Sequence, residues 1–355
     1  MANKKQQAKD GKNGSEHENL VDIDDRVWLA FRAYRNGILD PQRSQPPANL
    51  EDLRQRFGAA RDSASSPEST YDFYTDTANS AVNEATMVYE VGVALLQGRK
   101  TKGYRRAMNQ AFTAFPKDVG FNNGLSAPQP DFVEGLDIQE YEPFLVEEEA
   151  PSGVLYKDNP HSITLAHLAG EWKGAGKDME RARLQSAYDG AALVYARNQA
   201  LAVTGKPDSP GHAAVTTFTT DGSHLYSYAH YATGGAALMG YGEGQAEDEG
   251  EEHDADAVRY HQYLVQKTNL VDSHAEFKKG RRLVRNQQDY AKEQSYELKD
   301  CLRKQWKRRH SAVRAALQTA ADGAPMPQPR EAAAEEADEP SDEADAVVPG
   351  RLAGH

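Results

Sequence analysis

Two acidic residues and a lysine are placed so that they could hold a divalent cation. Asp131 begins an expected short strand at about 131–135, and Glu171 and Lys173 lie at the end of a second expected strand, 162–173. Side chains alternate along a strand, so Glu171 and Lys173 point to the same face. If Asp131 lies on a neighbouring strand, two carboxylates and one ammonium surround one small volume.

These groups are suited to the hydrolysis of phosphodiester bonds. Two carboxylates supply the hard oxygen ligands that Mg²⁺ or Mn²⁺ prefers, and such a cation keeps water ligands and accepts phosphate oxygens. The backbone carbonyl of Trp172, between Glu171 and Lys173, is a further candidate ligand. Lys173 could lower the pKa of a metal-bound water, or hold that water in line with a phosphorus atom.

The order of these residues resembles a known family signature. Pro130-Asp131, followed after an intervening stretch by Glu171-x-Lys173, resembles the signature of the PD-(D/E)XK, restriction-endonuclease-like superfamily. The surrounding sequence looks like an uncharacterised fungal group within that superfamily, and the resemblance covers residues 80–310.

Two further positions carry the resemblance. Gln185, with Tyr188 beyond it, lies in the helix expected after Glu-x-Lys and resembles an additional motif of the exonuclease-like branch. Glu84 lies in a helix expected before the Pro-Asp strand, where many members keep an acid. Glu134 follows Asp131 closely, but it points to the opposite face of a regular strand and is left out of the site.

The resemblance implies an α/β fold with a restriction-endonuclease-like core, in which helices flank a mixed central sheet and helical additions lie at both ends. It implies a nuclease that depends on Mg²⁺ or Mn²⁺ and acts on DNA, with RNA as the alternative substrate. The implied catalytic residues are Asp131, Glu171, Lys173 and Gln185. The implied metal ligands are Asp131, Glu171, Trp172 and Glu84.

A basic segment gives a second indication of nucleic-acid binding. Residues 273–318 hold 13 Lys and Arg against five acids, and such charge contacts phosphates without reading sequence. The same charge is equally typical of a solvated helix face or, at 303–310, of a nuclear localisation stretch. The candidate nucleic-acid-binding residues are Lys278, Lys279, Arg281, Arg282 and Arg285.

Composition limits the class of protein. The chain has 355 residues, of which 39% are apolar. It has no run of about 18 apolar residues, which excludes a membrane-spanning helix, and no secretory signal is expected at its start. A single cysteine, Cys301, excludes an internal disulfide and a cysteine-rich zinc site. We therefore expect a nuclear or cytoplasmic protein without a membrane partner.

The formal net charge of −13 is unevenly distributed. Residues 243–256 hold eight acids without Lys or Arg, and residues 322–355 hold nine acids with two Arg. Segments with high charge and few apolar groups cannot offset their ordering entropy. We therefore expect a disordered tail at 1–24, an acidic loop at 243–256 and a disordered acidic tail at 319–355.

Expected helices and strands alternate along the rest of the chain, which favours a mixed α/β layer fold. Residues 25–78 form an N-terminal helical extension and linker, and residues 79–318 form the nuclease-like domain. The acidic insertion 136–150 is expected to leave the core as a loop. Other expected elements are a linker at 60–70, helices at 79–98, 178–202, 257–268 and 273–318, a basic turn at 99–106 and a hairpin at 213–231.

Two other functions fit this sequence. A catalytically inactive descendant could keep the fold and bind nucleic acid or protein. An interaction protein could instead use its acidic tail and loop to recruit basic partners. The intact set of two acids and a lysine favours the enzyme, because a pure binding module has no physical need for it.

Overall fold

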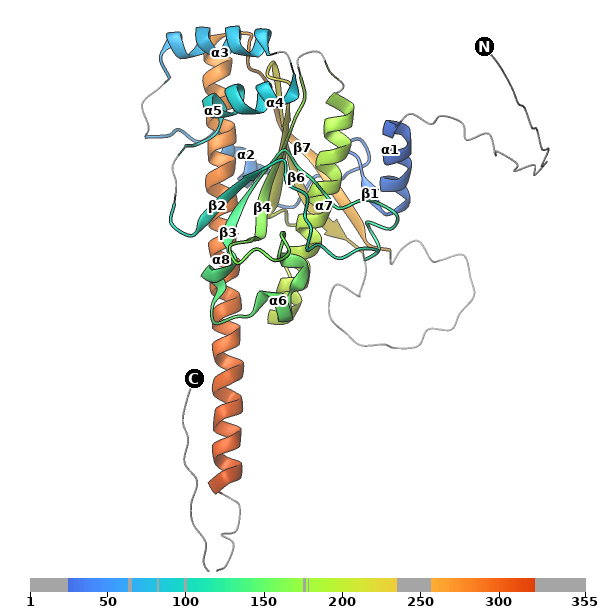
Figure 1. Cartoon of the computed structure of the whole chain (residues 1–355), viewed down its shortest axis with the longest axis vertical. Coiled ribbons are helices and arrows are strands. Elements are labelled where there is room, and N and C mark those ends of the chain that lie inside the picture. Colours follow the sequence, from blue (N-terminus) through green and yellow to red (C-terminus); the bar gives the residue numbers. More distant parts are fainter. Residues whose placement is uncertain are drawn as a thin grey trace, which may run out of the picture. The chain divides into compact units, whose positions relative to one another are not determined.

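The computed structural model describes residues 25–62, 66–81, 83–98, 101–174, 177, 179–234 and 257–322. Over these residues the protein is an α/β structure, with a mixed sheet of seven strands in the order β1-β7-β6-β5-β4-β3-β2 and helices on both faces (Figure 1). The strands are β1 (Ile38–Leu39), β2 (Tyr104–Met108), β3 (Phe132–Asp137), β4 (Ile163–Trp172), β5 (Val215–Thr220), β6 (His224–Thr233) and β7 (Arg259–Asn269). The coarse α/β class expected from the sequence is confirmed.

The middle of the sheet joins two kinds of strand pairing. β3 and β4 are antiparallel, whereas β4 and β5 are parallel and are connected by the long helix α7 (Met179–Thr204). β5 and β6 then form the expected antiparallel hairpin. The strands expected at 131–135 and 162–173 and the helix expected at 178–202 are confirmed.

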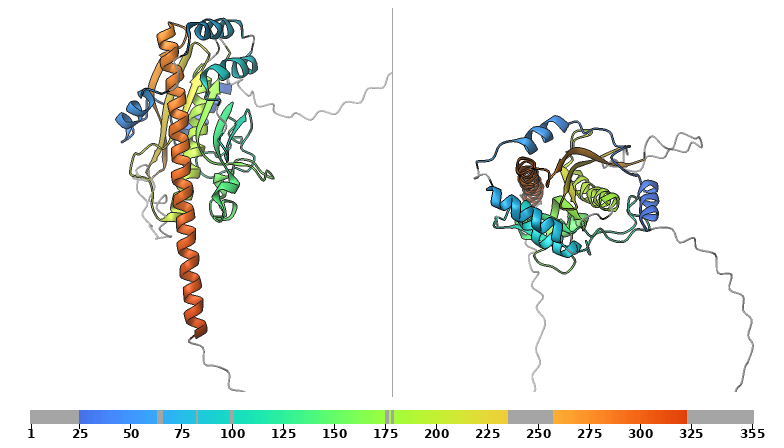
Figure 2. Two further views of the ribbon diagram at one scale, coloured as in Figure 1. Left: turned by 90° about the vertical axis from the view of Figure 1, so that its left-hand side faces the viewer. Right: turned by 90° about the horizontal axis from the view of Figure 1, so that it is seen from above.

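α7 packs on one face of the sheet, and residues 277–291 of α8 (His274–Asp322) pack on the opposite face (Figure 2). α7 is rich in alanine and buries nearly every turn against β4 and β5. Gly190 allows this close approach, because a Cβ at that position would collide with the His230 ring of β6. α8 buries Phe277 and Leu283 against the other face. The strands between the two helices are therefore almost fully buried.

The chain divides into two units, one up to Arg309 and one from His310. α8 belongs to the first unit as far as Arg309, and 310–322 are the described part of the second. The helix expected at 273–318 is confirmed and continues to Asp322. The disordered tail expected at 319–355 is wrong for residues 319–322, which continue α8. The disorder expected at 1–24 and over the rest of that tail, and the acidic loop at 243–256, lie outside the described residues. No helix of the described residues is long and apolar enough to cross a membrane.

The N-terminal region differs from the expected pattern. α1 (Asp25–Arg35) and α2 (Leu50–Gly58) are followed by α3 (Glu68–Ser80), so the linker expected at 60–70 ends early. The single helix expected at 79–98 is wrong. The chain is extended at Ala81 and restarts where the Asn83 side chain accepts a hydrogen bond from the Thr86 backbone N–H, at 2.8 Å. The resulting pieces are α4 (Glu84–Thr86), a π-helical turn (Met87–Val91) and α5 (Gly92–Leu95).

Two segments expected as helix and turn are strands. The helix expected at 257–268 is β7, which pairs with β6 along ten residues and also carries β1. Its Tyr260, Tyr263 and Val265 favour a strand, and β6 offers a long edge on which to pair. The turn expected at 99–106 gives way to β2, the edge strand beside β3.

The acidic insertion 136–150 does not leave the core as a loop. It forms two short 3₁₀ turns (Ile138–Tyr141 and Pro151–Gly153) around α6 (Val146–Glu149). Tyr141, Phe144 and Val146 are buried in the core, and their apolar area outweighs the acids that predicted a solvated loop. The β3–β4 register pairs Asp137 with Ile163, so the insertion lies at the opposite end of the hairpin from Asp131.

Candidate active site

The register of β3 and β4 brings Asp131 beside Glu171. Phe132 pairs with Gly170, so the residues just before and just after them meet at the same end of the hairpin. The Asp131 carboxylate Oδ2 accepts a hydrogen bond from the Trp172 backbone N–H at 2.7 Å. This bond fixes the Asp131 side chain against the end of β4.

Lys173 lies in the same cluster. Its Nζ donates to the Trp172 carbonyl at 2.8 Å and to Glu84 Oε2 at 3.3 Å, and lies 3.6 Å from Glu171 Oε2. Glu84 comes from α4, and its side chain is 45% exposed, whereas Lys173 and Glu171 are buried. The predicted residues Asp131, Glu171, Lys173 and Glu84 are therefore brought together by β3, β4 and α4.

An additional carboxylate, Asp189 of α7, faces this cluster and is 2% exposed. No donor reaches its Oδ2 or the Glu171 Oε1, and the two carboxyl groups lie within hydrogen-bond reach of each other. Burial and the neighbouring Asp189 raise the pKa of Glu171 well above its usual range, and burial raises the pKa of Asp189 to about 7. Burial also raises the pKa of Asp131, although the Trp172 N–H and Lys173 oppose the shift. The site therefore holds several carboxyl groups close together, and its own hydrogen-bond donors compensate their negative charge only in part.

Gln185 lies one turn before Asp189 on the same face of α7, because residues four apart share a helix face. Its carbonyl Oε1 is also buried without a partner. Tyr188, in contrast, donates to the Ser126 carbonyl at 2.6 Å and holds a loop. The helix therefore adds an amide and a carboxylate to the groups supplied by the strands.

An apolar floor supports the strand ends on the α8 side of the sheet. The Trp172 ring packs edge-on against Phe218, with centroids 4.8 Å apart, and against Phe132 at 6.0 Å. All three rings are fully buried. Glu134 also points to this side, where it pairs with Arg106 at 3.1 Å and accepts from Gln288 of α8, as its exclusion from the site predicted.

The donor set fits a divalent cation in its chemistry. Carboxylate oxygens of Asp131, Glu171 and Asp189 are hard ligands, and a cation would compensate the buried negative charge whose desolvation and mutual repulsion raise their pKa values. The Trp172 carbonyl and Glu84 are both engaged by Lys173. As the described side chains stand, no group of three His, Cys, Asp or Glu residues is arranged to hold a metal ion. Binding would therefore require side-chain rotation.

Three of the five candidate nucleic-acid-binding residues on α8 already bond to other groups of the protein. Arg281 Nε donates to the Ala94 carbonyl at 2.9 Å, and Arg285 donates to two carbonyls at the end of α5, each at 3.2 Å. Burial lowers the pKa of Arg285 to about 10. Lys279 pairs with Glu276 at 3.3 Å.

The other two members of this basic set, Lys278 and Arg282, are half-buried on α8. The Arg282 Nε is buried without a hydrogen-bond partner. Phosphate binding by all five residues stays a prediction, and Arg281 and Arg285 already have a structural role in joining α8 to α5.

Sequence reasoning missed Asp189. A signal was present, because an acid stands between small residues (Ala187, Gly190, Ala191) on a helix expected to pack closely on the sheet. Comparison of the chain with protein-family models, with curated proteins and with solved structures finds no match. The function of this protein is therefore inferred from the chemistry of its own residues.

Proposed function

We propose that this protein is a nuclease that uses Mg²⁺ or Mn²⁺ to hydrolyse phosphodiester bonds of DNA or RNA, on a restriction-endonuclease-like core. The observation that carries the proposal is the meeting of Asp131, Glu171 and Lys173 at one end of the β3–β4 hairpin. The mixed sheet flanked by helices is compatible with that core.

Asp131, Glu171 and Asp189 would hold the cation, with the unpartnered oxygens of Glu171 and Asp189 as its first ligands. When bound, the cation supplies a polarised phosphate oxygen and a more acidic water. The Trp172 N–H keeps Asp131 in place, and Glu84 keeps the Lys173 ammonium at the site entrance. Lys173 orients the attacking water or compensates charge that develops on the phosphate.

The apolar floor has a role in this proposal. Buried rings below Glu171 and Lys173 keep water away from the far side of the strands, which strengthens every charge interaction on the near side. Gln185 would orient either a water or a phosphate oxygen, because its amide carries both donor and acceptor groups.

A non-catalytic role is the second candidate. Lys173 already satisfies Glu84 and the Trp172 carbonyl, and the described side chains form no ready metal site. A cluster in which Lys173 is already engaged in this way could belong to a nuclease-like fold that binds nucleic acid or protein without cleaving it.

Cleavage assays distinguish the two candidates. The purified full chain is incubated with single-stranded DNA, duplex DNA and RNA, with Mg²⁺ or Mn²⁺ and with EDTA. We expect metal-dependent cleavage that is lost in Glu171→Gln and kept in Glu134→Gln, a matched change of a buried acid on the other side of the sheet. Cleavage of no substrate with either ion would favour the non-catalytic role, and equal cleavage by Glu171→Gln would place the activity elsewhere.

A further inference from the structure

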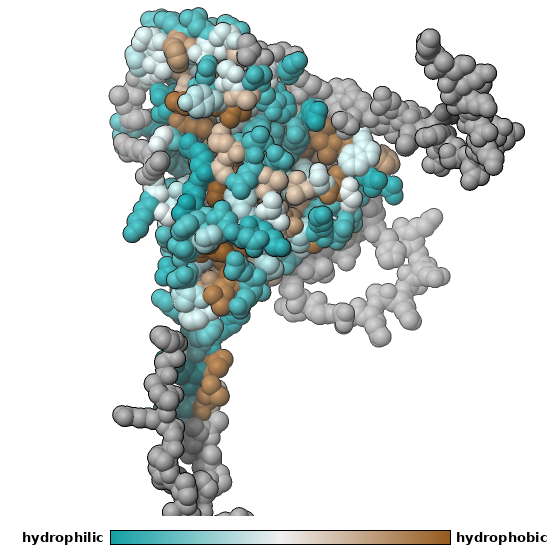
Figure 3. Space-filling model, viewed as in Figure 1, coloured by the Kyte–Doolittle hydropathy of each residue, from teal (hydrophilic) through white to brown (hydrophobic). Residues whose placement is uncertain are grey.

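α1 presents a row of aromatic rings to the solvent. Trp28, Phe31 and Tyr34 follow each other at intervals of three residues and are 40%, 56% and 50% exposed. Figure 3 shows brown and near-white side chains gathered over α1 at the right of the view. The opposite side of the helix buries Ala33 in the core. α1 is therefore anchored to the domain while its three largest rings remain partly exposed to solvent.

An arginine lies over each of these rings. The guanidinium carbon is 5.3 Å from the ring centroid for Arg32 on Trp28, 5.5 Å for Arg35 on Phe31 and 4.4 Å for Arg43 on Tyr34. Arg43 lies outside α1, in a turn. In this turn the Asp40 side chain accepts a hydrogen bond from the Arg43 backbone N–H at 3.0 Å. We call these six residues the aromatic–arginine face.

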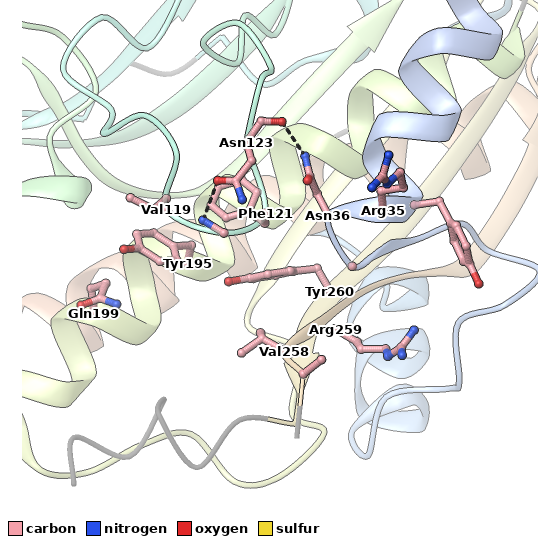
Figure 4. A pocket seen from close by; sticks show the side chains of 14 residues that line it. Arg35, Asn36, Val119, Phe121, Asn123, Tyr195, Gln199, Val258, Arg259 and Tyr260 are labelled. Atoms are coloured by element: carbon pink, nitrogen blue, oxygen red, sulfur yellow. Dashed lines mark hydrogen bonds between the residues drawn. The ribbon is translucent and has the colours of Figure 1, made fainter. Parts of the chain in front are cut away.

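A polar cavity of about 590 Å³ continues from the end of this face. Arg35 lies on one side of it and Gln199 of α7 on the other (Figure 4), and Tyr34 also lines it. Its wall is a packed aromatic cluster, because Phe121 lies 5.4 Å from Tyr195 and 5.1 Å from Tyr260 between ring centroids.

Asn36 ties the end of α1 to this cavity. Its side-chain amide donates to the Asn123 carbonyl at 3.1 Å, and the Asn123 side chain accepts from the Gly120 N–H at 3.1 Å. Figure 4 shows both bonds above the rings of Phe121, Tyr195 and Tyr260. The cavity thus combines aromatic surface with amides that both donate and accept, the pair of features that a nucleobase requires.

We infer that the aromatic–arginine face and the adjoining cavity bind single-stranded nucleic acid. Unpaired bases expose faces that stack on aromatic rings and on the guanidinium planes that lie over them, and the N–H groups of these arginines contact the phosphates. A duplex keeps its base faces covered and offers no such stacking. The inference deepens the proposed nuclease function by naming its substrate class, and to that extent rests on it, although the binding itself needs no cleavage.

Other occupants fit this face less well. A second copy of the chain related by a two-fold axis would bring the same arginines against one another, with like-charge repulsion. A lipid surface would require apolar side chains to enter the acyl region, whereas here each ring carries a guanidinium. The polyanion is the occupant that matches both the rings and the charge.

Binding to a fluorescent 20-nucleotide single strand, followed by anisotropy in EDTA, tests the inference on the full chain. We expect wild type to bind the single strand more tightly than a duplex of the same length. Trp28→Ala combined with Phe31→Ala should weaken binding roughly 100-fold, as expected for the loss of two stacked bases. The matched control is Phe73→Ala on α3, which removes a ring that is 64% exposed elsewhere and should leave affinity unchanged.

Two conservative variants guard against a folding artefact. Phe31→Trp should keep the affinity, and Trp28→Phe should keep it while removing the quenching of tryptophan fluorescence on binding. Arg32→Gln with Arg35→Gln should weaken binding and reduce its salt dependence, whereas Arg54→Gln on α2 should not.

Three results would overturn the inference: unchanged affinity in the folded double alanine variant, equal affinity for duplex, or no binding by wild type. Self-association of wild type or binding to phosphatidylserine vesicles, if lost in the same variant, would assign the face to another occupant. A protein that binds single strands in EDTA but never cleaves them would contradict the nuclease proposal alone.

Discussion

α7 carries two buried charged residues, Arg197 and Asp189. The polar groups around Arg197 find more hydrogen-bond partners than those around Asp189. Arg197 donates two hydrogen bonds to Asp208, at 2.6 and 2.8 Å, and contacts His167 Nε2 at 2.7 Å, while His167 Nδ1 meets Ser295. Burial and Arg197 keep the pKa of His167 well below its usual range, so the ring stays neutral.

The other cluster lies eight residues earlier on the helix, about 12 Å along its axis. Asp189 and Glu171 are also buried, yet no donor reaches one oxygen of each carboxyl group, and the two carboxyl groups lie within hydrogen-bond reach of each other. The polar groups around Arg197 show that this fold can supply hydrogen-bond partners to a buried charged cluster. The Arg197 cluster has the hydrogen bonds of a structural network, whereas the proposed function assigns the Asp189 cluster to a cation.

The largest effect on stability is expected from breaking the hydrogen-bonded network of Arg197, Asp208 and His167, which we call the closed network. Arg197→Met leaves the Asp208 carboxylate and the His167 ring without their main partner. We expect a loss of about 3 kcal/mol in the free energy of unfolding, the lower end for a broken buried ion pair because Asp208 is partly exposed. Urea denaturation measures this loss. A change below about 1 kcal/mol would show that the network contributes little to the fold.

We call the residues of the candidate active site, Asp131, Glu171, Lys173 and Asp189, the open cluster. In this cluster, Lys173→Met should lower catalysis more than metal binding. Removing the ammonium removes a group that orients water or compensates charge, which is commonly worth about 10²–10³ in rate. The affinity for Mn²⁺ should be kept or increased, because a competing positive charge is gone. Single-turnover cleavage measures the expected loss of rate, and Mn²⁺ titration measures the expected affinity. A parallel loss of cleavage rate and Mn²⁺ affinity would make Lys173 a structural residue.

The pH dependence of stability provides a further contrast. The folded-state pKa of Asp189 is raised to about 7 from 3.8, so the folded protein binds more protons than the unfolded chain between these values. In EDTA, wild-type stability should therefore fall as pH rises from about 4 to 7. Asp189→Asn should reduce that fall and be the more stable protein above pH 7. Parallel pH profiles from thermal unfolding would contradict this.

The smallest effect is expected at Glu84. Its side chain is 45% exposed and bonds to Lys173 at 3.3 Å. Exposed ion pairs contribute about 0–1 kcal/mol, so Glu84→Gln should change the free energy of unfolding by less than about 1 kcal/mol. Cleavage should fall less than in Lys173→Met. A loss of all Mn²⁺ binding in this variant would make Glu84 a principal ligand instead.

The sequence predicted the part of the site that depends on local rules. Alternation along β4 places Glu171 and Lys173 together, and the Pro-Asp position identifies Asp131. Asp189 could not be derived this way, because its place depends on how closely α7 approaches the sheet at Gly190.

Other misses also depend on tertiary contacts. The helix expected at 257–268 became β7 because β6 offered a long edge for pairing. The insertion 136–150 was expected to leave the core as a loop, but Tyr141, Phe144 and Val146 bury it in the core. The helical extension expected from residue 25 begins with α1, but which of its faces meets the domain also depends on tertiary contacts, and Phe31 is 56% exposed.

Mn²⁺ titration of the full chain at pH 7.5, followed by isothermal calorimetry, tests the central claim that the open cluster is a metal site. We predict saturable binding by wild type and Glu134→Gln, and loss of that binding in Glu171→Gln. Glu134 is an equally buried acid on the opposite side of the sheet, so it controls for the loss of a buried carboxylate. No saturable binding by wild type, or unchanged binding by Glu171→Gln, would contradict the account.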